Sequence, residues 1–303
     1  MSSGRPRTHA ERVASRDGYF APESVIRRIG NSPLTPLLGG GPAVLLQVAH
    51  PLVAVGVVEH SDYRRDLWRR LRRTLQALYL ITYGTRSEAD RAGEAVRKTH
   101  AGVRGTTSVQ LGSYPAGTPY SADDPELMLW VHATLVVCSM SAYGRFVAPL
   151  GRDEEDRYYR EMRIVARIFG VPDSVLPRSL GAFREYFDAQ VAGDTITVTP
   201  PARDVAAVIL AADLPVPARV LAPAHRLASA GLLPPRIRRE YGLRWDPLHE
   251  RALPWAARAM RVATIPALRA ASHLRRPRPQ WNRLADYGSR RAGFPDDRAR
   301  VRS

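Results

Sequence analysis

The sequence contains one cysteine, Cys138, among its 303 residues. A single thiol excludes an intramolecular disulfide, a cysteine-based zinc site, an iron–sulfur cluster held by four thiolates and the C-x-x-C-H attachment of c-type haem. So little cysteine is typical of a reducing compartment, and we expect the protein to be cytoplasmic. The first 18 residues, MSSGRPRTHAERVASRDG, are polar and lack the apolar core of a secretory signal.

Lysine is almost absent as well, because arginine supplies 44 of the 45 basic side chains and Lys98 is the only lysine. The net charge is +16, and its distribution is uneven. Residues 251–303 carry thirteen arginines and three aspartates, a local charge of +10, and residues 1–30 carry six arginines and three acids, a local +3. Residues 31–250 therefore carry only +3. A basic tail of this kind contacts anionic surfaces non-specifically.

Long uninterrupted apolar runs are also missing. The longest run, residues 42–58, has 17 residues and contains Gln47, His50, Pro51 and Gly56. A membrane-spanning helix needs about 20 cleaner apolar residues. We therefore expect no transmembrane segment, and we interpret the run as a buried helix that Pro51 kinks or divides.

Strand-like alternation is confined to ITVTP at residues 196–200, and no internal repeat is present. The remaining pattern predicts an all-α fold with one helical domain over residues 21–274, an N-terminal arm over 1–20 and an irregular basic tail over 275–303. Residues 105–122, rich in Gly, Ser, Thr and Pro, are predicted to form a long loop. The predicted helices span residues 22–30, 42–58, 62–83, 87–103, 125–147, 153–169, 179–192, 203–212, 217–230 and 247–273.

Local signals mark several of these helix ends. The glycines 39–41 are predicted to break the chain before the apolar run. The segment 87–90, Ser-Glu-Ala-Asp, resembles a capping box that opens a helix ending before Gly105. Asp124 followed by Pro125 predicts another helix start, because acids and proline both favour the first turn.

Three of the eight histidines lie on apolar helix faces. His132 has apolar residues three and four positions before and after it, His100 continues an apolar stripe that begins at Ala89, and His50 lies inside the apolar run. Each is either a core histidine that hydrogen bonds to a neighbour or a neutral imidazole available to a metal or a haem iron.

The histidine spacing narrows the choice of metal site. The sequence has no H-E-x-x-H or H-x-x-x-H pair and none of the E-x-x-H pairs of di-iron bundles. What remains is a site with one protein ligand or with histidines from separate helices. Haem b in an all-α pocket fits, since it needs one axial histidine, an apolar slot and arginines for its propionates. A thiolate ligand from Cys138 is a weaker alternative, because its VVCSM context is that of a small buried apolar residue.

Five segments in a fixed order carry a family resemblance. They are GGGPAVLLQVAHPLVAVGVVEHSDY (39–63), RLRRTLQALYLITYG (70–84), AVRKTHAGVRG (95–105), YSADDPELMLWVHATLVVCS (120–139) and EEDRYYREMRIVARIFGVPDSVLP (154–177). Over about residues 20–245, this set resembles the family that joins the MpaB-type oxygenases to the latex-clearing rubber oxygenases. The resemblance implies an all-α, globin-like core that binds haem b and uses O2 to cleave a carbon–carbon double bond in an isoprenoid-like or other apolar substrate.

The resemblance also implies roles for individual residues. His100 lies in the segment that matches the family's axial haem ligand. Arg70, Arg73 and Thr74 match the basic and hydroxyl residues of the distal side. The rubber oxygenases have a lysine that can bind iron at the position of Arg73. Arginine has no lone pair to donate, so Arg73 is not an iron ligand here.

Other residues complete the predicted site. Glu59, next to His60, is the nearest candidate for the catalytic base that the family uses, and His132 and His50 are further candidates for contact with the cofactor. An alternative to an oxygenase is a haem-binding sensor or carrier, which the change at Arg73 favours. A basic helical nucleic-acid-binding protein is a third interpretation, although no helix-turn-helix signature or series of stacking aromatics supports it.

Overall fold

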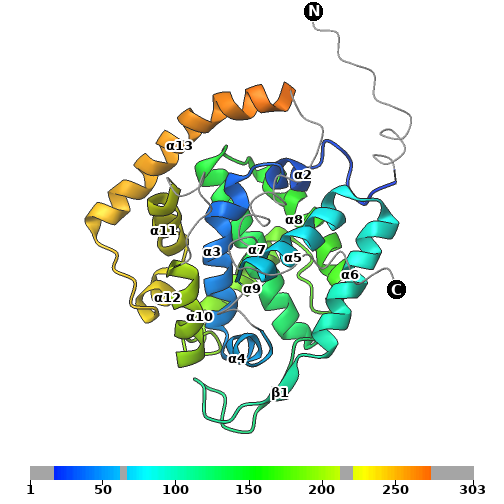
Figure 1. Ribbon diagram of the computed structural model, residues 1–303, viewed down its shortest axis with the longest axis vertical. Helices are drawn as coiled ribbons and strands as arrows, with labels where there is room; N and C mark the ends of the chain where they lie inside the picture. The colour runs from blue at the N-terminus through cyan, green and yellow to red at the C-terminus, as the bar shows by residue number, and fades with distance from the viewer. Residues whose placement is uncertain (1–16, 62–66, 212–220, 274–303) are drawn as a thin grey trace, which may run out of the picture.

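The computed structural model describes residues 17–61, 67–211 and 221–273, and this part of the chain is helical apart from one small hairpin (Figure 1). The all-α prediction is thereby confirmed. The helices are α2 (Val25–Gly30), α3 (Leu34–Ala49), α4 (Pro51–His60), α5 (Leu67–Tyr83), α6 (Arg86–Ala101), α7 (Pro125–Phe146), α8 (Arg152–Phe169), α9 (Leu180–Ala192), α10 (Pro200–Ala211), α11 (Ala222–Gly231), α12 (Pro235–Glu240) and α13 (Pro247–His273).

The helix α3 runs through the middle of the molecule and packs against α7, α10 and α11 (Figure 1). At its end the chain bends by 105° into α4. His50 is the extended residue at the bend, and Pro51 occupies the first turn of α4. Proline is well tolerated there, because that turn has no intrahelical acceptor for its missing N–H. The prediction that Pro51 divides the apolar run is confirmed.

The predicted break at residues 39–41 is wrong, because these glycines lie inside α3. A Cβ atom on Gly39 would lie 2.9 Å from the carbonyl oxygen of Cys138, and one on Gly41 would lie 2.4 Å from Oγ of Ser229. The glycines therefore let the backbone of α3 touch α7 and α11. This close packing offsets the low helix propensity of glycine, about 1 kcal/mol per residue.

Two further local predictions need correction. The capping box of α6 is formed by Thr85 and Glu88, two residues before the predicted pair, and the helix ends at Gly102 rather than at Gly105. The predicted loop 105–122 contains most of an antiparallel hairpin, in which β1 (Arg104–Thr106) pairs with β2 (Pro119–Ser121). The hairpin forms through backbone hydrogen bonds between residues 104–106 and 119–121, and the composition of the loop does not reveal this pairing.

The strand-like alternation at 196–200 does not correspond to a strand, since these residues are irregular up to the start of α10. Ile196 and Val198 are buried, as an alternating strand would have them. The backbone N–H of Thr197, however, donates to the carbonyl of Ala49, and that of Val198 donates to the carboxylate of Glu240. The alternation thus reflects a buried connecting segment whose partners are helix ends, not another strand.

The helix α7 begins and continues as predicted. The Asp124 carboxylate accepts from the backbone N–H groups of Glu126 and Leu127, which caps the helix. Among the described residues, α7 is the single helix long and apolar enough to span a membrane, and the bent pair α3 and α4 passes the same test if counted together. More than half of the apolar window of α7 is buried inside the molecule, and the core helix of a globular protein meets this criterion too.

The two predicted terminal segments are only partly within the described residues. Residues 1–16 of the predicted arm and the whole tail 275–303 lie outside them. Phe20 is buried in the main apolar core, and the Tyr19 hydroxyl donates to Asp90 in α6 over 2.6 Å. Tyr19 and Phe20 are therefore packed onto the helices.

Candidate functional site

The α6 helix places His100 on its inner face. Ala89 and Ala92 are buried on that face, and His100, two turns further along, is half-buried. Gly93 on the same side approaches α8 so closely that a Cβ atom there would lie 2.5 Å from the carbonyl oxygen of Ile168. The structure therefore holds His100 on a face of α6 that is directed toward the neighbouring helices.

His132, near the middle of α7, is buried, and neither of its ring nitrogens has a hydrogen-bond partner among the described residues. Burial disfavours the charged imidazolium and lowers the pKa of His132 to about 4. The ring is therefore neutral, with one nitrogen lone pair free. Buried polar groups are almost always hydrogen bonded, so such a ring calls for an explanation.

His50 is equally buried, but its nitrogens are both engaged. Nδ1 accepts from the backbone N–H of Leu52 over 3.3 Å, and Nε2 lies 3.3 Å from the Tyr114 hydroxyl. With Nδ1 as acceptor, the neutral ring carries its proton on Nε2 and donates it to Tyr114. Burial, opposed by the charge of Asp124, lowers its pKa to about 4. His50 thus caps α4, and in this arrangement it has no nitrogen left for a ligand.

Glu59 and His60 at the end of α4 are brought together by a residue that the sequence analysis missed. The buried Tyr120 in β2 donates its hydroxyl hydrogen to the Glu59 carboxylate, and Nε2 of His60 lies 3.1 Å from the same hydroxyl. Burial, followed by the hydrogen bond to Glu59, raises the pKa of Tyr120. Tyr120 falls within the predicted loop, and no sequence signal placed it beside α4.

This cluster is tightly confined on one side. A Cβ atom on Gly105 in β1 would lie 2.6 Å from the Tyr120 hydroxyl oxygen, and one on Gly56 in α4 would lie 3.7 Å from the ring. Glu59 and His60 themselves are exposed. A carboxylate, a phenol and an imidazole therefore stand in one hydrogen-bonded row that reaches solvent, an arrangement that can relay a proton.

The predicted distal residues lie on α5, which packs against α6 and α2. The side chain of Arg70 is outside the described part of the structure, and Arg73 and Thr74 are exposed. Leu71 and Leu75, on the same helix, are only half-buried. The structure thus shows an α5 with a polar outer face and apolar side chains that its neighbours cover incompletely.

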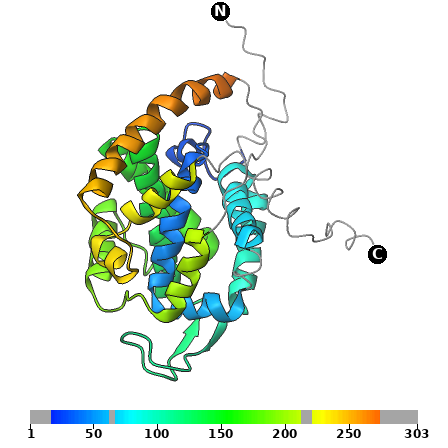
Figure 2. The same cartoon turned by 60° about the vertical axis from the view of Figure 1, so that its left-hand side comes forward.

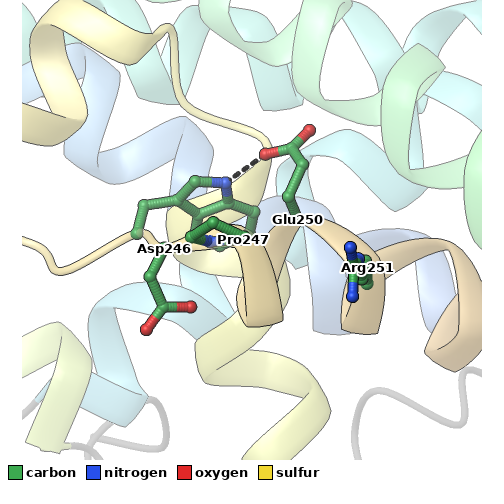
Figure 3. A pocket seen from close by; sticks show the side chains of 5 residues that line it. Asp246, Pro247, Glu250 and Arg251 are labelled. Carbon is green, nitrogen blue, oxygen red and sulfur yellow. Dashed lines mark hydrogen bonds between the residues drawn. The ribbon is translucent and has the colours of Figure 1, made fainter.

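Two surface hollows are present, and neither is lined by a histidine. One, of about 530 Å³, is beside the C-terminal half of α6 and is lined by Glu94, Arg97, Lys98, Ala101, Asp123, Met128 and Gly170. The other, of about 380 Å³, is at the start of α13 (Figure 3). Among the described residues, no three His, Cys, Asp or Glu side chains gather closely enough to hold a metal ion by themselves.

Comparison with known proteins identifies relatives along most of the chain. Residues 27–264 match the family described as ER-bound oxygenase mpaB/B'/Rubber oxygenase, catalytic domain. Uncharacterized proteins from Mycobacterium bovis and Mycobacterium tuberculosis are each 29% identical to this chain over 226 residues, which is 73% of this chain and 85% of the relative. No solved structure matches. The chain therefore belongs to the mpaB and rubber oxygenase catalytic-domain family, a family of oxygenases.

Proposed function

We propose that this protein is a haem b-dependent oxygenase that cleaves a carbon–carbon double bond in an isoprenoid-like or other apolar substrate. Membership of an oxygenase family supports the reaction class. The observation that supports the haem is His132, a neutral, buried imidazole whose two nitrogens have no hydrogen-bond partner within the described parts of the chain. A core histidine with a structural task would be hydrogen bonded, as His50 is.

The residues present fit a haem in their donor chemistry. His100, which matches the family's ligand segment, would hold the iron, and His132 is the alternative ligand or a second imidazole beside the group. Arg70 and Arg73 would supply positive charge for the propionates or for bound oxygen. The half-buried leucines of α5 offer apolar surface to a flat macrocycle or to the substrate. Bound haem supplies the iron that activates O2.

The chain's own residues would manage charge and protons. Arg70 and Thr74 would donate hydrogen bonds to a negatively charged group held beside α5, a contribution of roughly 2–4 kcal/mol in comparable sites. The Glu59 carboxylate accepts a proton from the allylic carbon of the substrate. Tyr120 holds that carboxylate in place, and His60 on the far side of the phenol connects it to solvent.

An absorption spectrum of the purified protein tests the proposal. We expect a Soret band at about 400–420 nm, the range of histidine-ligated haem. His100→Ala should abolish it, and added imidazole should restore part of it by filling the vacated position. A full, unshifted band in His100→Ala would transfer the ligand role to His132, and His132→Leu would then lose the band instead. His50→Asn is the matched control and should keep the wild-type spectrum.

A second candidate function is a haem-binding sensor or carrier without oxygenase activity. Arg73 in place of the rubber oxygenases' lysine, together with a second interior imidazole at His132, favours it. A spectrum typical of two histidine ligands, unchanged by O2, would support the carrier. In Arg70→Ala, the turnover of an apolar alkene and the haem content can both be measured. A loss of turnover far larger than the loss of haem would support the oxygenase.

A further inference from the structure

The outer face of α13 carries an exposed apolar stripe. Leu248, Trp255 and Val262 are 73%, 73% and 68% exposed, and the fourth strongly exposed large apolar side chain of the described residues, Val109, lies elsewhere. The three residues are seven positions apart, so they follow one line along the helix. Single exposed apolar residues are ordinary, but three aligned on one helix mark an interaction surface.

The opposite face of α13 fixes this orientation. Leu253, Ala257 and Met260 are buried in the main core. Nε of Arg261 also donates to the backbone carbonyl of Arg145 at the end of α7 over 2.8 Å. Both views show α13 along the outer edge of the molecule (Figures 1 and 2). The apolar stripe therefore cannot turn inward without loss of the packed face.

Exposed arginines flank the stripe. Arg251 follows Leu248 by three residues and Arg258 follows Trp255 by three, so each guanidinium lies beside an apolar side chain on the outer face. Residues 247–273 contain four arginines and one glutamate. The surface is thus both apolar and cationic.

The acidic groups of α13 are confined to its start and are already paired. Glu250, labelled in Figure 3, accepts from Nε1 of Trp245, and the Arg238 guanidinium lies 4.3 Å from the centre of that indole ring. Asp246 caps the helix and accepts from His249 over 2.8 Å. These contacts hold the two carboxylates at the start of α13, and among the described residues no carboxylate pairs with the arginines beside the stripe.

We propose that the outer face of α13 binds an anionic lipid surface. Its indole and aliphatic side chains would enter the boundary between headgroups and acyl chains, while Arg251 and Arg258 pair with lipid phosphates. Charge complementarity selects this partner. In a dimer formed through this face, the arginines of the two copies would repel each other. An anionic membrane offers negative charge to the arginines and an apolar region to the stripe. The proposal does not depend on haem.

Co-sedimentation of the full chain with vesicles tests it. We expect binding to vesicles of phosphatidylglycerol and phosphatidylcholine in equal parts, little binding to phosphatidylcholine alone, and weakening by added salt. The stripe variant Leu248→Ser/Trp255→Ser/Val262→Ser and the charge variant Arg251→Glu/Arg258→Glu should each bind about tenfold more weakly. All five positions are exposed or lie on the exposed face, and circular dichroism verifies that the variants fold.

Matched control variants distinguish binding through this surface from non-specific binding to vesicles. Val109→Ser removes an exposed apolar side chain elsewhere, and Arg152→Glu/Arg178→Glu reverses two exposed charges on other elements. Both should bind vesicles as the wild type does. Equal binding by the stripe variant and the wild type would overturn the proposal. So would a wild-type dimer in sedimentation velocity that the stripe variant dissociates while vesicle binding stays absent, since that result assigns the face to a second copy.

Discussion

The surroundings of His50 and of His132 are both buried, and burial lowers the pKa of both imidazoles to about 4. They differ in what the ring nitrogens do. His50 caps α4 through Leu52 and contacts Tyr114, whereas His132 has no hydrogen-bond partner among the described residues. The first ring contributes to the fold, and the second costs stability unless something binds to it.

This difference shows why burial alone does not identify a functional histidine. Both sequence contexts are apolar, and both rings are neutral. Only the hydrogen bonds of the ring nitrogens distinguish a histidine that caps a helix from one whose imidazole is available to a ligand.

The largest expected effect is on acid stability. The unfolded chain protonates each histidine below about pH 6.5, whereas the folded chain resists protonation until about pH 4. Titration of the two rings therefore leaves the free energy of unfolding unchanged above pH 6.5 and lowers it as the pH falls from 6.5 to 4, by about 3 kcal/mol for each ring. Urea unfolding across this range measures the loss. His132→Leu should reduce it by about half, and an unchanged slope would show that His132 is protonated in the folded protein.

The next largest effect is expected for the cap. His50→Leu removes the acceptor for the Leu52 N–H and the partner of the Tyr114 hydroxyl, so we expect a loss of about 2 kcal/mol in the free energy of unfolding at pH 7. His50→Asn is the control, because asparagine is a good N-cap residue and should recover most of the loss. Equal destabilisation by leucine and asparagine would mean that packing, not the cap, explains the role of His50.

The opposite sign is expected for the other ring. In haem-free protein at pH 7, His132→Leu removes an unsatisfied buried polar group and should raise the free energy of unfolding by about 1–2 kcal/mol. His132→Asn replaces one unsatisfied group with another and should give no gain. If His132→Leu destabilises the protein as His50→Leu does, the two regions are alike and the argument for a ligand at His132 fails.

The smallest effect on stability is expected at the Glu59 cluster. Tyr120→Phe removes one hydrogen bond to an exposed carboxylate and should cost about 1 kcal/mol in thermal or urea unfolding. Gly105→Ala should be more damaging, because its methyl group would collide with the Tyr120 hydroxyl. That damage should be smaller in the Tyr120→Phe background. Additive losses in the double variant would show that the two residues do not touch.

Much of the helical framework was predictable because its signals are local. Asp124 before Pro125 and Gly170 after α8 mark helix ends through the conformations and hydrogen bonds of one or two residues. The 3.6-residue spacing of apolar side chains predicted the inner face of α6 in the same way. The family-matched segments around His100 are likewise a property of the sequence.

The tertiary structure decided what depends on partners far apart in the chain. A run of glycines predicts a helix break from the sequence alone. In the structure Gly39 lies inside a helix, where its missing side chain leaves room for the Cys138 backbone. Tyr120 joins Glu59 and His60 because the hairpin returns to α4. His50 and His132 lie in similar apolar contexts in the sequence, but only the folded chain supplies one with hydrogen-bond partners and leaves the other without them. Helix ends and apolar faces depend on residues that are close in the sequence. The hydrogen-bond partners of a buried side chain and the close packing of helices depend on elements that only the folded chain brings together.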